Sequence, residues 1–127
     1  MSAPRMTLVR GLMAGLLTAC AVAQTGSAAL RAQLDRAVAD PRCDADAQCR
    51  SVAMGHRACG GPESYGVYSL KVHNEAEVLR LAQQYRETRR AENQASGRVS
   101  TCVALPDPGA RCEAVTQRCV LGTRPAQ

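Results

Sequence analysis

The spacing of hydrophobic and polar positions changes several times along the chain, and these changes predict its secondary structure. Between Ala28 and Ala39, leucine and valine recur every four positions beside charged residues, which predicts a short amphipathic helix ending at Asp40-Pro41. The apolar stripe of this helix is narrow. The helix can therefore either dock on a folded domain or lie at a membrane surface, and the pattern leaves both alternatives open.

Two strands with a glycine-rich loop between them are predicted next. Cys49–Met54 alternates larger and smaller side chains, and Tyr65–Val72 places apolar residues on both of its faces. Gly55 and the run Cys59-Gly60-Gly61-Pro62 interrupt the pattern, because glycine adopts backbone angles that other residues resist and proline fixes its own φ. We therefore expect a β-hairpin with a long loop.

The strongest signal is a helix that begins after Asn74 and ends at Ser96-Gly97. Asn74 and Glu77 have the spacing of a capping box, in which each side chain binds a free backbone N–H of the first turn. One face is apolar, and the opposite face spaces carboxylates and arginines for ion pairs. The apolar face consists of Val78, Leu81, Ala82 and Tyr85, and the expected pairs are Glu77 with Arg80 and Glu87 with Arg90.

The last part of the chain predicts a second hairpin. Residues 99–105 alternate apolar and small side chains, and Val115–Leu121 is expected to pair with them across the turn Pro106-Asp107-Pro108-Gly109. The resulting order β-β-α-β-β predicts a small α+β domain, a disulfide-stapled antiparallel sheet with one main helix on a face.

The N-terminal segment has the pattern of an export signal. Residues 1–19 combine basic residues with an apolar stretch about half as long as the roughly 20 residues that span a bilayer. The run Leu17-Thr18-Ala19-Cys20 resembles the lipobox of bacterial lipoproteins, which implies that Cys20 becomes the lipid-carrying first residue. By the same resemblance, Ala21 implies the outer membrane, facing the periplasm. Ala21-Val22-Ala23 is an alternative cleavage site, which would release a soluble periplasmic or secreted protein.

These signals divide the chain into four parts. Residues 1–19 are expected to be a signal peptide and 20–42 a lipid anchor, tether and short helix. Residues 43–121 are expected to form the disulfide-rich α+β domain, and 122–127 a tail.

Seven cysteines compensate for a core without Phe or Trp. Cys20 belongs to the anchor or is removed with the signal, and an even remainder in an exported chain indicates three disulfides. Spacing does not fix the pairing; we favour Cys112 with Cys119, and Cys102 with Cys59 or Cys43. Zinc-type C-x2-C pairs do not occur in the sequence, so we expect neither metal nor cofactor. The six remaining cysteines are Cys43, Cys49, Cys59, Cys102, Cys112 and Cys119.

Charge and aromatic content argue against a nucleic-acid partner. The net charge of +5 falls to +3 once Arg5 and Arg10 leave with the signal, and the arginines are spread along the chain. A nucleic-acid binder normally concentrates basic residues and interleaves aromatic ones. We therefore interpret the arginines as a solvated surface.

Candidate chemistry is sparse. His56 and His73 are the two histidines of the chain, and with nearby carboxylates such as Asp44, Asp46 or Glu63 they could serve a small periplasmic enzyme. The sequence contains no serine elbow, phosphate loop or His-Glu-x-x-His motif. Solvated surface residues explain the histidines and carboxylates better than an acid–base site does.

The block Cys59-Gly60-Gly61-Pro62 resembles a class of small exported bacterial proteins that share it, followed by a helix and late cysteines. The resemblance covers residues 43–121 and implies a fold and a location, but no activity. The block is either a disulfide-pinned turn or a rigid recognition loop, since tyrosines on a fixed loop bind with little entropy loss. The contacts of such a loop would be Gly60, Gly61, Pro62, Glu63, Tyr65 and Tyr68.

Together, these observations predict an envelope lipoprotein that acts as a non-enzymatic binding or inhibitor-like module. Its expected partners are the membrane, through the N-terminal lipid, and a protein of the envelope. A small periplasmic enzyme and a purely structural protein are the alternatives.

Overall fold

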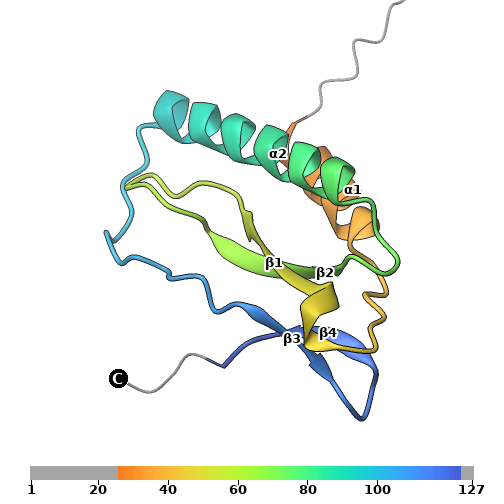
Figure 1. Ribbon diagram of the computed structural model, residues 1–127. Coiled ribbons are helices and arrows are strands. Elements are labelled where there is room, and N and C mark those ends of the chain that lie inside the picture. The colour runs from red at the N-terminus through yellow and green to blue at the C-terminus, as the bar shows by residue number, and fades with distance from the viewer. Residues whose placement is uncertain (1–25, 124–127) are drawn as a thin grey trace, which may run out of the picture.

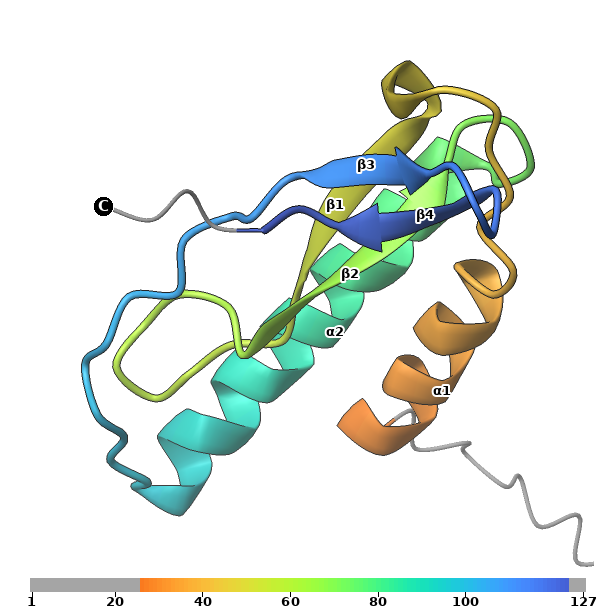
Figure 2. The same ribbon diagram turned by 90° about the horizontal axis from the view of Figure 1, so that it is seen from below.

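A central two-stranded sheet is covered by two helices on one face and by a second two-stranded sheet on the other (Figures 1 and 2). The computed structural model describes residues 26–123, so the predicted signal peptide, Cys20 and the end of the predicted tail lie outside the described residues. The predicted α+β class and β-β-α-β-β order are confirmed. In chain order the elements are α1 (Ser27–Ala37), a 3₁₀ turn (Asp46–Gln48), β1 (Cys49–Met54), β2 (Ser64–Ser69), α2 (Glu75–Ser96), β3 (Ala110–Glu113) and β4 (Arg118–Leu121).

The central sheet contributes to two separate cores because its side chains alternate between faces. Val52, Met54 and Tyr68 lie among the helices, whereas Cys49 and Val67 pack toward the β3–β4 hairpin. The helix-side core holds the large apolar residues, and the hairpin side is built mainly on cysteines. The helix-side core consists of Leu30, Leu34, Val52, Met54, Tyr68, Val78, Leu81, Ala82 and Tyr85.

Helix α1 docks on the domain, which decides between the two alternatives that its sequence left open. Leu30 and Leu34 are buried in the helix-side core. At its N-terminal end, the Ser27 backbone N–H and hydroxyl donate to the two carboxylate oxygens of Glu92 on α2, at 3.2 and 2.8 Å. The folded unit therefore includes residues upstream of Cys43.

Helix α2 begins and ends where the sequence predicts. The Asn74 side chain accepts a hydrogen bond from the Glu77 N–H at 3.2 Å, and Gly97 ends the helix with a φ of 61°. The Glu77 carboxylate pairs with Arg80 as expected, at 2.6 Å, instead of returning to the cap. The second expected ion pair, Glu87 with Arg90, does not form within residues 26–123. The Glu87 carboxylate instead accepts a hydrogen bond from the Gln83 side chain. Across the same residues, no helix is both long and apolar enough to cross a bilayer.

The predicted strand at residues 99–105 is wrong. This segment is irregular, and Val99 and Val103 are 95% and 66% exposed. Its backbone bonds to side chains instead of to a strand: the Val103 carbonyl accepts from Arg57, and the Leu105 carbonyl from the Tyr65 hydroxyl. The last hairpin accordingly starts later, at Ala110, and its turn lies at residues 114–117.

All six predicted disulfide cysteines are paired, and two of the three bridges attach the β3–β4 hairpin to the rest of the fold. Cys43 bonds to Cys112, and Cys49 to Cys119. The predicted bridge between Cys112 and Cys119 is therefore wrong: the two residues are register partners in β3–β4, but each reaches toward the segment beneath the hairpin. The third bridge, Cys59–Cys102, confirms one of the two predicted alternatives.

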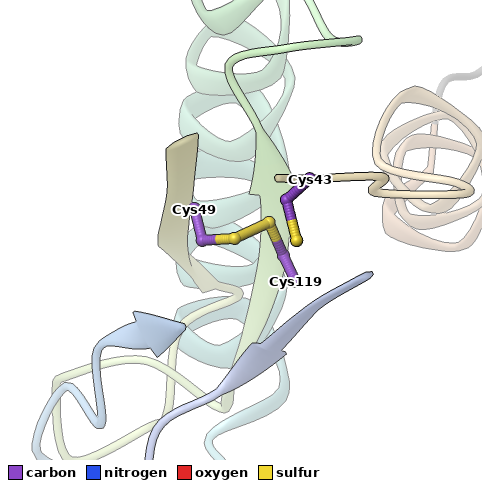
Figure 3. A group of neighbouring side chains, drawn as sticks. All are labelled: Cys43, Cys49 and Cys119. Carbon is purple, nitrogen blue, oxygen red and sulfur yellow. A yellow bond between two sulfur atoms is a disulfide. The ribbon is translucent and has the colours of Figure 1, made fainter. Parts of the chain in front are cut away.

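The Cys49–Cys119 bridge lies beside the sulfur of Cys43 (Figure 3), which bonds to Cys112. The sulfurs of Cys43, Cys49 and Cys119 are all within 4.8 Å of one another and are buried. Such a cluster has the composition of a metal site, but metal ligation requires thiolates, and these sulfurs are in disulfides. The cluster therefore serves as the second core of the domain.

Candidate binding cleft

A cleft lies between the loop that joins β1 to β2 and the C-terminal half of α2. Figure 2 shows these two segments next to each other. Its larger hollow, about 470 Å³, is lined by residues that include His56, Gly60, Arg90 and Arg98. A second hollow of about 380 Å³ extends along α2 past Pro62. His56 and Arg90 line both hollows, so the two are parts of one continuous surface.

The loop wall of the cleft is rigid because it is tied internally and to the segment that follows α2. The Arg57 N–H donates to the Gly61 carbonyl and the Gly60 N–H to the Arg57 carbonyl, both at 2.9 Å. Gly60 and Gly61 have φ angles of 102° and 77°, a region that glycine adopts without strain. Cys59 bonds to Cys102, and this bridge is exposed at both ends, unlike the two beneath the hairpin.

The helix wall is tied to the same loop by a partly buried ion-pair network. Arg89 on α2 pairs with the Glu63 carboxylate at 2.7 Å and with Glu92 at 2.8 Å. The Tyr85 hydroxyl donates to the other Glu63 oxygen at 3.2 Å. The hydrogen bonds that Arg89 donates to Glu63 and Glu92 raise the pKa of its guanidinium, and the bonds that Ser27 and Arg89 donate to Glu92 lower the pKa of that carboxyl. The network therefore connects the β1–β2 loop to α2 and, through the bonds of Ser27 to Glu92, to α1.

Two close contacts complete the attachment of the loop. The Asn93 side-chain amide donates to the His56 carbonyl. Gly55, which begins the loop with a φ of 75°, lies against Glu63 so closely that an added Cβ would come within 2.4 Å of the carboxylate Oε2. A side chain at position 55 would therefore push Glu63 away from Arg89.

Positive charge gathers on the rim of the cleft. Arg86, Arg90 and Arg98 are exposed, and within residues 26–123 none of them forms an ion pair. The carboxylate of Glu87 lies on the same rim, and the single positive charge of Arg89 is shared between Glu63 and Glu92, which leaves one excess negative charge in that network. The rim therefore carries more positive than negative charge. The interpretation of the arginines as a dispersed surface missed this cluster, although Arg86 and Arg90 lie one turn apart on α2 and Arg98 follows the end of that helix.

The two histidines have different surroundings. The His73 Nδ1 accepts from the Ser69 N–H at 3.0 Å, and its Nε2 lies 2.8 Å from the Ala39 carbonyl, so this ring joins the end of β2 to the segment after α1. This pattern requires the tautomer with the proton on Nε2. The His56 ring lines the cleft, and its buried Nδ1 has no hydrogen-bond partner among the described residues.

Of the acid–base sets considered from sequence, the structure places His56 and Glu63 on the lining of one hollow of about 250 Å³, and each of the carboxylates considered is held by another partner. Asp44 pairs with Lys71 at 2.7 Å, and the hydrogen bond from this lysine lowers the pKa of Asp44. Asp46 accepts from the Cys112 N–H at 2.7 Å. Glu63 is engaged by Arg89 and Tyr85, whereas both ring nitrogens of His73 are used elsewhere.

The predicted recognition loop is divided by the structure. Gly60 and Gly61 are exposed at the cleft, and Pro62 lines it. Tyr65 is half-buried and engaged with the segment after α2, and Glu63 holds the loop to the helix. The prediction of Tyr68 as a contact residue is wrong, because its side chain is 3% exposed and its hydroxyl donates to Glu75 at 2.8 Å.

No protein-family model, curated protein or solved structure matches this chain. The resemblances to lipoproteins and to exported proteins with the CGGP block stay predictions.

Proposed function

We propose that this protein is a non-enzymatic, inhibitor-like binding module of the bacterial envelope, which holds its partner in the cleft between the β1–β2 loop and α2. The observation that carries the proposal is the way the cleft is built. The loop wall is fixed by the Cys59–Cys102 bridge, and the helix wall is held to it by the Glu63–Arg89 ion pair. Arg86, Arg90 and Arg98, which lie on the rim, have no ion-pair partner in the described part of the chain. A preorganised surface binds with little loss of conformational entropy.

Export is supported by the three disulfides, which form and persist in oxidising compartments. For anchoring, we propose that Cys20 carries the lipid and that the protein faces the periplasm from the outer membrane. Six residues separate Cys20 from Ser27, a span of at most about 25 Å when extended. An anchor at Cys20 would therefore hold the domain close to the membrane.

The anchoring proposal is tested by intact mass spectrometry of the protein from the cells that make it. A mature chain that begins at Cys20 with the added mass of acyl groups is the expected result. A chain that begins at Gln24 without added mass would show cleavage after Ala23 and exclude the anchor.

The binding proposal is tested by photo-crosslinking in living cells. The photoreactive residue p-benzoylphenylalanine replaces Gln94, an exposed residue that lines the larger hollow, or Val115, which is 92% exposed on the β3–β4 turn. We expect discrete crosslinked products from position 94 and none of the same mass from position 115. Equal products from both positions, or none from position 94, would contradict the proposed binding surface.

A further inference from the structure

The charge on the cleft indicates the class of ligand. Arg86, Arg90 and Arg98 are exposed around it without ion pairs in the described residues. Glu87 and the one excess negative charge of the Glu63–Arg89–Glu92 network offset part of this positive charge, but Arg90 and Arg98 line the larger hollow together. Like charges held together on a rigid surface repel one another, and a bound group with more than one negative charge relieves this repulsion. A single carboxylate carries one charge, whereas a phosphate monoester carries close to two near neutral pH.

The side chains also have suitable donor chemistry. A guanidinium presents N–H groups in a fixed fork that matches two oxygens of a phosphate. Arg90 and Arg98 line the same hollow from opposite sides of the turn at Gly97, and Gln94 adds an exposed amide between them. The hollow, about 470 Å³, is larger than a phosphate, so the remainder of a ligand has room beside the rigid loop.

The position of the cleft in the fold suggests where such a ligand comes from. Ser27, the first residue of α1, is bonded to Glu92, and Glu92 shares a smaller hollow with Arg98. The N-terminal end of α1 therefore lies near Arg98. If Cys20 is anchored, the arginines lie within reach of lipid headgroups.

We infer that the cleft formed by Arg90, Arg98 and the β1–β2 loop binds a phosphate monoester group, supplied either by a lipid headgroup or by a soluble phosphate. The inference rests on the proposed function, since it specifies the ligand of the same cleft. Arg90 and Arg98 bind the phosphate oxygens, and Arg86 adds charge at the rim.

The test is a titration of the full chain, purified in an uncharged maltoside detergent, followed by NMR of ¹⁵N-labelled arginine side chains. The probes are inorganic phosphate, dihexanoyl phosphatidic acid and, as a zwitterionic control, dihexanoyl phosphatidylcholine. The test variant is Arg90→Gln/Arg98→Gln. The matched control is Arg36→Gln/Arg111→Gln, which removes the same charge from two exposed arginines on α1 and β3 that form no ion pair in the described residues.

We expect the phosphate probes to shift the Arg90 and Arg98 resonances and the zwitterionic lipid to leave them unchanged. The test variant should bind about 100-fold more weakly, about tenfold for each charge-assisted contact, and the control within about twofold of the wild type. Tighter binding of phosphatidic acid than of phosphate assigns the ligand to the membrane, and equal binding assigns it to a soluble phosphate.

The inference is overturned if neither phosphate probe binds, or if both double variants weaken binding equally. Either result would leave the proposed function standing, provided that crosslinks from position 94 persist. Loss of those crosslinks would instead contradict the cleft itself.

Discussion

Gly55 is the residue at which a single added methyl group tests how the cleft is held. It has a φ of 75°, and a Cβ there would lie 2.4 Å from Oε2 and 2.7 Å from the carboxylate carbon of Glu63. Gly55→Ala therefore imposes two costs. The first is the left-handed backbone, and the second is the displacement of Glu63 from Arg89 and Tyr85.

The two costs have separate magnitudes. A left-handed conformation costs an L-residue about 1–2 kcal/mol. Hydrogen bonds to a charged group contribute about 1.5–3 kcal/mol, and the Glu63 and Arg89 side chains are 27% and 24% exposed, so solvent screens them only in part. We expect Gly55→Ala to lower the free energy of unfolding by about 2.5–5 kcal/mol, the sum of both contributions.

Gly97→Ala is the matched control. Gly97 has a similar φ of 61°, and nothing lies within 4 Å of an added Cβ, so it should show the backbone cost alone, about 1–2 kcal/mol. The assay is urea unfolding with the disulfides intact, followed by far-ultraviolet circular dichroism. In a Glu63→Ala background, Gly55→Ala should likewise cost about 1–2 kcal/mol. Equal losses for Gly55→Ala and Gly97→Ala would refute the role of the Glu63 contact.

Three further predictions concern the bridges, His73 and Tyr68. Mild reduction should open the exposed Cys59–Cys102 bridge before the two buried bridges, and alkylation with peptide mass spectrometry would show this order. Crosslinking from position 94 should then fall while the helical circular dichroism signal persists. Equal alkylation of all six cysteines would contradict this order. His73→Ala should destabilise the fold by about 1–3 kcal/mol in urea unfolding, because the Ser69 N–H and Ala39 carbonyl lose their partner, and should leave cleft crosslinking unchanged; loss of crosslinking from a folded variant would contradict a structural role. Burial and the hydrogen bond to Glu75 raise the pKa of Tyr68 to about 12, from 10.0 in the unfolded chain, so its contribution to stability is complete below pH 10 and lost between pH 10 and 12. In urea unfolding curves measured over this pH range, Tyr68→Phe should remove that part of the decline in the free energy of unfolding. An unchanged decline would contradict the assignment to Tyr68.

Local patterns predicted the regular elements well. Helix α2 carries both its cap and its terminating glycine in the sequence, and β1 carries a strict alternation, so each is specified by residues close to one another. The alternation at residues 99–105 predicted a strand that does not form, because such a pattern indicates β propensity but not whether a neighbouring strand is available for pairing. There the Cys59–Cys102 disulfide holds the segment, and the side chains of Arg57 from the β1–β2 loop and Tyr65 from β2 donate to its backbone carbonyls instead.

The cleft could not be predicted from local patterns. Its arginines come from α2 and from the segment after it, and the opposite wall lies some 30 residues earlier in the chain. Glu63 and Tyr68 were predicted as contact residues because they are polar and lie near a glycine-rich loop. The burial of Tyr68 and the pairing of Glu63 with Arg89 depend on tertiary structure, which local patterns do not predict. The disulfide pairing has the same origin: Cys112 and Cys119 face each other in the hairpin, but the layer beneath it decides their partners.

The most direct test of the account is the crosslinking yield from position 94 in cells that carry either arginine double variant. The account predicts that Arg90→Gln/Arg98→Gln abolishes the crosslinked product while Arg36→Gln/Arg111→Gln preserves it, at equal protein levels. Equal yields from the two variants would contradict the claim that Arg90 and Arg98 hold the partner in the cleft between the β1–β2 loop and α2.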